Sequence, residues 1–210
     1  MNKPSSMLEL EELGRVRLSK HFFMREMLYS EIGNFHGIPN IPDDPDVAIA
    51  AGARLCEEIL EPLHATFGHV TVRSAFRSAS VNEYGVLRRD QGYGCGPTKW
   101  NYARHVWDHR DEQGCLGATA SIVIPWFLPH YESGTPWQAL AWWIHDHLPY
   151  SDMLFYAKNA AFNIHWHEKP ERYIDSFMDG QKQSLTAPGM DNHSGDHSDQ
   201  YPGFPKLKTE

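Results

Sequence analysis

Apolar residues recur along the chain with regular spacings that predict its helices and strands. Leu55, Ile59 and Leu63 repeat at every fourth position and build one apolar helical face. Asp44-Pro45 predicts the start of this helix, because Asp caps helix N-termini and Pro is tolerated in the first turn. Gly68 predicts its end. The pattern therefore predicts one long amphipathic helix in the first third of the chain.

Alternating and β-branched stretches predict strands, and further apolar faces predict helices. The predicted strands cover residues 69–74, 118–125, 151–156 and 161–167, the last two as a hairpin-like pair. Further helical segments are predicted at residues 18–30, 79–87 and 135–147. Helices and strands in one chain of this length indicate an α+β protein.

Composition divides the 210 residues into three parts. Residues 1–17 are predicted to be an N-terminal extension, and residues 18–186 a single domain. Residues 187–210 are rich in Gly, Asp, His, Ser and Pro, so they can bury little apolar surface. The last part is therefore predicted to be a flexible tail.

Charge and cysteine content exclude several classes of function. The formal net charge of −8 argues against a general nucleic-acid binder, which needs a basic face. The three cysteines, Cys56, Cys95 and Cys115, form no C-x-x-C pair and predict neither a disulfide framework nor a thiolate zinc knuckle. The apolar runs are too short to span a bilayer, and residues 1–12 contain no signal-peptide core. We expect synthesis in the cytoplasm, with the site of action left open.

Several short motifs follow one another in a defined order. Residues 37–42 read Gly-Ile-Pro-Asn-Ile-Pro, residues 60–63 read Leu-Glu-Pro-Leu, and residues 70–78 read Val-Thr-Val-Arg-Ser-Ala-Phe-Arg-Ser. With Phe22 and Glu26 before them, these motifs resemble the zinc D-alanyl-D-alanine carboxypeptidases, a peptidoglycan-cleaving family that shares the hedgehog-type fold. The resemblance covers residues 18–176. It implies a small antiparallel sheet with helices packed on one face.

The resemblance also implies a chemistry. In the family, two histidines and an aspartate hold a zinc ion, whose bound water has a pKa of ~7 and is activated by a glutamate. An arginine at the position of Arg77 is expected to hold the carboxylate or carbonyl oxygen of the substrate. We therefore predict substrate binding by Arg77, with Ser74 and Asn82 beside it. The alternative is that Arg77 ties its loop to the next helix.

The metal-binding positions depart from the family pattern. Ser121 stands where the family has aspartate, and Tyr156 stands where it has the base. His105 and His165 occupy plausible histidine positions, but an insertion rich in ligand types follows His105. The predicted zinc ligands are His105, Asp108, Asp111, His165 and His167, and the nearest candidate base is Glu168. The alternative is a solvated loop and surface histidines.

Two functions follow from these patterns. The first is a zinc-dependent peptidase that cleaves peptidoglycan stem peptides or similar short peptides. The second is a catalytically inactive module that keeps the fold and binds a peptide or a partner in the cleft. In either case we expect a peptide or peptidoglycan fragment as the partner, and neither nucleic acid nor a membrane.

Overall fold

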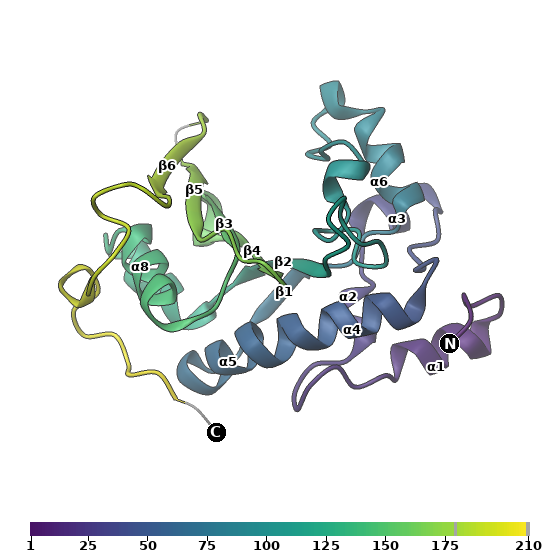
Figure 1. Cartoon of the computed structure of the whole chain (residues 1–210), viewed down its shortest axis with the longest axis horizontal. Coiled ribbons are helices and arrows are strands. Elements are labelled where there is room, and N and C mark those ends of the chain that lie inside the picture. Colours follow the sequence, from purple (N-terminus) through teal and green to yellow (C-terminus); the bar gives the residue numbers. More distant parts are fainter. Residues whose placement is uncertain (179, 209–210) are drawn as a thin grey trace.

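The computed structural model describes residues 1–178 and 180–208, which form an α+β structure around one sheet (Figure 1). The helices are α1 (Met7–Gly14), α2 (Met24–Met27), α3 (Glu31–His36), α4 (Pro45–Leu55), α5 (Glu61–Phe67), α6 (Ala79–Val86), α7 (Leu128–Glu132) and α8 (Trp137–His147). The strands are β1 (Thr71–Ser74), β2 (Gly117–Val123), β3 (Asp152–Tyr156), β4 (Phe162–His167), β5 (Tyr173–Phe177) and β6 (Gln183–Thr186). No helix in the described ranges has the length and apolar character that a bilayer crossing requires.

The long helix predicted from the apolar repeat is confirmed. The Asp44 side chain caps α4 by accepting a hydrogen bond from the backbone N–H of Val47 at 3.2 Å. Gly68 ends α5 with a φ of 82°, a conformation that favours glycine. A π-helical turn, Cys56–Leu60, joins α4 to α5. Pro62 explains this turn, because proline has no N–H to continue the regular bonding.

The sheet has the strand order β1-β2-β4-β3-β5-β6. The predicted pairing of β3 with β4 is confirmed, with Asp152 opposite His165. The prediction of a wholly antiparallel sheet is wrong at one pair, because β5 runs parallel to β3. The chain leaves β4 beside the start of β3, and residues 168–172 are a short connection. β5 therefore begins at the same end as β3 and runs in the same direction.

One face of the sheet packs against helices and forms the core. Alternation places Ala118, Ala120 and Ile122 of β2 on this face, where all three are fully buried. α4 lies against β2 and β4, while Trp137 at the start of α8 packs on Phe155 with ring centroids 4.8 Å apart. Figure 1 shows α4 and α5 as one long helix beneath the strands, with α8 on the side away from α6.

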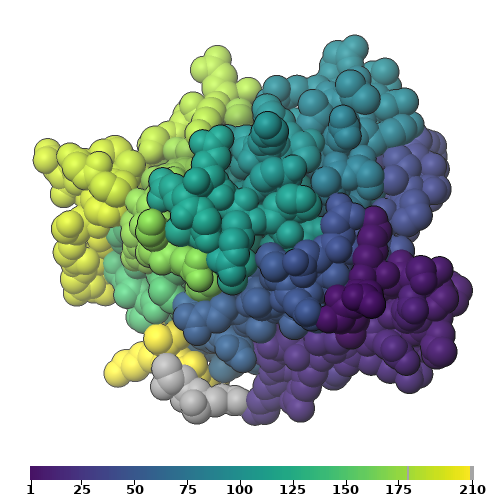
Figure 2. All heavy atoms as spheres, turned by 45° about the vertical axis from the view of Figure 1, so that its right-hand side comes forward, coloured from purple at the N-terminus to yellow at the C-terminus, as the bar shows by residue number. Residues whose placement is uncertain are grey.

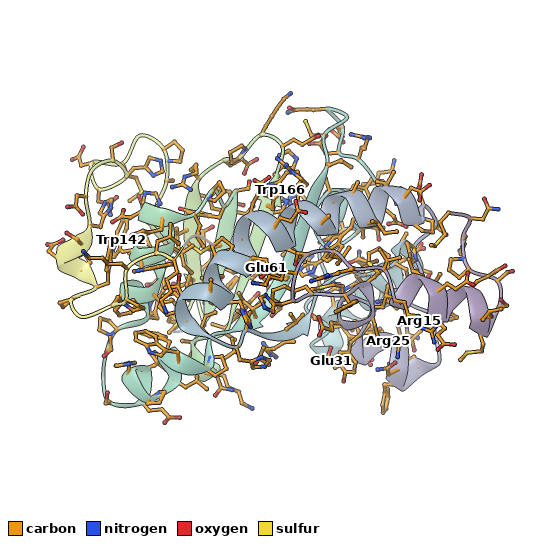
Figure 3. All side chains as sticks on the ribbon, turned by 90° about the horizontal axis from the view of Figure 1, so that it is seen from below. Arg15, Arg25, Glu31, Glu61, Trp142 and Trp166 are labelled. Carbon is orange, nitrogen blue, oxygen red and sulfur yellow. The ribbon has the colours of Figure 1, made fainter. Side chains whose placement is uncertain are left out.

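Trp166 marks where the long helix meets the sheet (Figure 3). Its indole Nε1–H donates to Glu58 Oε2 at 2.8 Å, and the guanidinium of Arg54 lies 5.5 Å from its ring centroid. Burial of this large aromatic ring with a partner for its N–H fixes the helix on β4.

Residues 187–208 lie against the body of the protein, although composition predicted a flexible tail. Phe204 packs with Trp126 at a centroid distance of 5.2 Å, and Trp143 donates its indole N–H to Pro205 O at 2.9 Å. Figure 3 shows Trp142 next to the yellow C-terminal segment, where its ring stacks on His197 at 4.2 Å. The average composition of this segment is polar, but its few aromatic residues provide the apolar contacts that hold it against the body.

Candidate functional site

The second face of the sheet carries polar side chains. Ser74 of β1 is opposite Ser121 of β2, and Ser121 is opposite Asn163 of β4. A bulge between Val72 and Ser74 shifts the register, so Ser74 rather than Arg73 is the partner of Ser121. The three side chains therefore form a polar row across three neighbouring strands.

This row forms the floor of a cavity of about 570 Å³, which we call the cationic pocket. Its lining residues are Arg73, Ser74, Arg77, Gly94, His105, Ser121, Tyr156, Lys158, Asn159 and Asn163. Three of them have basic side chains, and none is a carboxylate. Within residues 1–178 and 180–208, Arg73, Arg77 and Lys158 form no ion pair. A protein of net charge −8 thus has a local site that attracts anions.

Arg77 is held at the edge of this pocket by its own surroundings. Its Nη1 donates to Asn82 Oδ1 at 3.0 Å and contacts Cys95 Sγ at 3.2 Å, while its backbone N–H donates to His105 O at 2.7 Å. Asn82 is fully buried and reaches Thr98 and Gly96 O instead of the pocket. Asn82 therefore orients Arg77 and does not line the pocket, whereas Ser74 does.

His105 is a neutral hydrogen-bonding group in this site. Burial, reinforced by the charge of Arg77, lowers its pKa to about 3. Its Nδ1 lies 3.1 Å from Ala75 O, so the N–H is on Nδ1 and donates to this carbonyl. Nε2 has no hydrogen-bond partner among the described residues, and His105 lines the pocket. The ring thus offers one acceptor among many donors.

Tyr156 provides a hydroxyl at the position where the sequence resemblance predicted the base. Burial raises the pKa of Tyr156, while the charges of Arg73 and Arg77 oppose this shift. Its Oη accepts a long hydrogen bond of 3.4 Å from Asn163 Nδ2. A neutral phenol beside two arginines can donate a hydrogen bond, but it does not replace a carboxylate as a base.

His165 belongs to a second buried group, two positions along β4 from Asn163 of the pocket. Its Nδ1 lies 2.6 Å from Asp152 Oδ2, and its Nε2 lies 2.8 Å from Ala103 O. Arg104 Nη1 donates to the same Asp152 oxygen at 2.7 Å. Burial opposes ionisation of Asp152, but His165 and Arg104 outweigh it and hold its pKa at about 2. Both ring nitrogens of His165 therefore face acceptors.

The insertion does not deliver its carboxylates to His105. Asp108 is buried, accepts a hydrogen bond from the backbone of Asp43 at 2.6 Å and pairs with His109 at 3.1 Å. Asp111 pairs with His167 Nε2 at 3.1 Å. Glu168 accepts a hydrogen bond from the backbone N–H of Leu116 at 2.7 Å.

The residues expected to hold zinc therefore do not fit one ion of the family type. Two groups of three ligand side chains converge within the described residues, and neither includes His105, Asp108 or His165. His165 would have to release Ala103 O or Asp152 before it could bind a metal. We assign no reaction step to a zinc ion between His105 and His165.

Several residues of the site were not predicted from the sequence. Arg73, Lys158 and Asn163 line the pocket, and Asp152 with Arg104 fixes His165. Strand alternation offered a signal for Asn163, two positions before His165. Lys158 lies on a loop turn with no such pattern, and only the folded sheet brings it to the pocket.

Comparison of the chain with protein-family models, with curated proteins and with solved structures gave no match.

Proposed function

We propose that this chain is a binding module, built on a fold of the zinc D-alanyl-D-alanine carboxypeptidase type, that holds the carboxylate end of a short peptide in the cationic pocket. The observation that carries the proposal is the set of three cations without carboxylate partners around a row of hydroxyl and amide groups. Guanidinium groups suit a carboxylate because they donate two parallel hydrogen bonds. The motif order from Phe22 to His165 supports the fold assignment.

The arrangement favours binding over hydrolysis. Neutral His105, the phenol of Tyr156 and the serine hydroxyls supply hydrogen bonds, and the pocket lining contains no carboxylate to serve as base. The family's peptidase activity requires a metal-bound water and such a base. A peptide from peptidoglycan, or a similar short peptide with a free C-terminus, remains the ligand class that we propose.

Calorimetric titration with a synthetic stem peptide ending in D-Ala-D-Ala tests the proposal. We expect the free acid to bind and its C-terminal amide to bind at least tenfold more weakly. Arg77→Gln should weaken binding of the acid by about 10- to 100-fold, which corresponds to the ~1.5–3 kcal/mol of a hydrogen bond to a charged group. Lys158→Gln, on an exposed turn, should weaken it without disturbing the fold.

The matched control is Arg89→Gln, an exposed arginine outside the pocket, which should bind the acid like wild type. Equal affinity for acid and amide, or an unchanged affinity in both pocket variants, would contradict the proposal. Mass spectrometry of the peptide after incubation with protein and Zn²⁺ should show it intact. Cleavage would instead support the peptidase hypothesis.

A further inference from the structure

Three side chains of metal-ligand type converge at the end of β4, outside the cationic pocket. Asp111, Cys115 and His167 each present one ligand atom, and these atoms all lie within 4.8 Å of one another. Two come from the loop of residues 111–115, and the third is the last residue of β4. Thiolate, imidazole and carboxylate are the three ligand types that Zn²⁺ binds in proteins.

The loop is already folded in the form that a metal site needs. The backbone N–H of Asp111 donates to Cys115 O at 3.1 Å. Asp111 Oδ1 accepts the backbone N–H groups of Cys115 at 2.7 Å and Gln113 at 2.9 Å. These bonds use Oδ1 and leave Oδ2 to face His167. Little conformational entropy is therefore lost when Asp111 and Cys115 bind one ion.

His167 is oriented for the same centre. Its Nε2 lies 3.1 Å from Asp111 Oδ2, and its Nδ1 lies 3.1 Å from Lys169 N and 2.9 Å from Lys169 O. In the tautomer with the proton on Nδ1, this carbonyl accepts the N–H and the Nε2 lone pair points at the cluster. A backbone carbonyl that fixes the second nitrogen is a common outer partner of zinc-binding histidines.

Charge and access also suit a divalent cation. The Cys115 side chain is almost fully buried and forms no hydrogen bond among the described residues. Its thiolate and the Asp111 carboxylate together would balance two positive charges. Asp111 and His167 line a cavity of about 570 Å³, which leaves room for a water as a fourth ligand.

The second converging group is a poorer site. It consists of His21, Glu61 and His64 on the surface near α5. Both oxygens of Glu61 are already engaged, because Oε1 accepts from Ser19 at 2.6 Å and Oε2 pairs with His21 at 2.7 Å. It also lacks a thiol, so it serves as an internal comparison.

We propose that Asp111 Oδ2, Cys115 Sγ and His167 Nε2 bind one Zn²⁺, which ties the 111–115 loop to the end of β4. This site shares no residue with the cationic pocket. The result of a metal-binding experiment therefore does not depend on the peptide-binding proposal. A zinc ion at this place does not require His105 or His165.

Cobalt substitution of the full chain tests the site. Wild type should bind one Co²⁺ with a thiolate-to-cobalt charge-transfer band and the intense visible bands of four-coordinate cobalt, and Zn²⁺ should displace it. Cys115→Ser should abolish the charge-transfer band. His167→Gln should weaken Zn²⁺ binding by at least about 100-fold, the upper end of what outer partners alone contribute.

Two controls separate this site from the alternatives. His64→Gln should keep the affinity of wild type, and Cys56→Ala should keep the charge-transfer band. Bound Zn²⁺ should also protect Cys115 from alkylation in the wild-type protein, a readout that needs no variant. The proposal is overturned if wild type binds no stoichiometric metal, if Cys115→Ser retains the band, or if His64→Gln abolishes binding.

Discussion

His105 shows how a single residue changes its role once its neighbours are known. The sequence placed it where a family ligand belongs, and that position gave it a metal-binding role. In the folded chain, burial and the Arg77 charge keep its ring neutral, and Ala75 O fixes the Nδ1–H tautomer. The side chain therefore fits an acceptor of a hydrogen bond inside an otherwise donor-rich pocket.

The lowered pKa of His105 predicts a pH-dependent stability. Between its ordinary value of 6.5 and about 3, the unfolded state binds a proton that the folded state does not. The free energy of unfolding therefore rises with pH in this window. The stability that neutral His105 contributes decreases again as the pH falls from 6.5 toward about 3. We expect wild type to lose about 2 kcal/mol more than His105→Gln between pH 7 and pH 5.

Urea denaturation of both proteins at the two pH values measures this difference. His145 also has a pKa lowered by burial, so His105→Gln should keep a smaller slope of the same sign. Parallel pH profiles for wild type and variant would show that folding does not lower the pKa of His105.

At the scale of elements, the start of β2 allows the loop at residues 103–104 to lie directly on the polar face of the sheet. Residues 103 and 104 contact this face, and Figure 2 shows the teal atoms of this part of the chain between green atoms and blue atoms. Ala103 O reaches His165 Nε2, and Arg104 O accepts the backbone N–H of Thr119 at 2.9 Å. This close approach depends on Gly117 at the start of β2.

Gly117→Ala should therefore destabilise the protein. A Cβ at this position would lie 2.0 Å from Ala103 O and 2.8 Å from His165 Nε2, and the backbone carbonyl cannot move aside easily. We expect a loss of about 1–3 kcal/mol, the usual cost of overpacking. Urea denaturation midpoints measure it.

Gly94→Ala is the matched control, because an added Cβ there meets no atom within 4 Å. Its stability should be close to that of wild type. If Gly117→Ala were equally well tolerated, the 103 loop would not be held against β2 as described.

At the scale of the whole molecule, the C-terminal segment covers the far end of α5 and α8. Phe204 packs with Phe67 and Phe127 at centroid distances of 6.2 and 5.9 Å. His197 Nδ1 pairs with Asp146 at 2.6 Å, and the Lys208 N–H donates to Thr66 at 3.0 Å. Aromatic packing, an ion pair and a hydrogen bond thus attach this segment to the core.

Phe204→Ala should remove the aromatic packing that holds the C-terminal segment on the core. We expect a loss of about 2 kcal/mol, less than the ~3–5 kcal/mol of a fully buried phenylalanine because Phe204 is half-buried. Limited proteolysis should then cut within residues 187–208 sooner than in wild type. Met190→Ala, at a side chain that is 41% exposed, should change neither measurement.

The sequence predicted much of the local structure correctly. The apolar repeat located the helix from Pro45 to Phe67, and alternation located β1, β2, β3 and β4. It also singled out Arg77, which lines the pocket. β5 and β6 were missed, because Tyr173–Phe177 and Gln183–Thr186 are short and flanked by charged or polar residues.

Local patterns by themselves determined which segments are helices and strands, since hydrophobic period and capping act between residues close in the chain. Only the tertiary structure decided which polar residues meet. Asp111 pairs with His167 and accepts the backbone N–H of Cys115, and Asp108 accepts the backbone N–H of Asp43. The three basic side chains of the cationic pocket lie together with no carboxylate in its lining. These pairings depend on strand register and on the path of the 87–116 segment. No spacing within the sequence encodes either one directly.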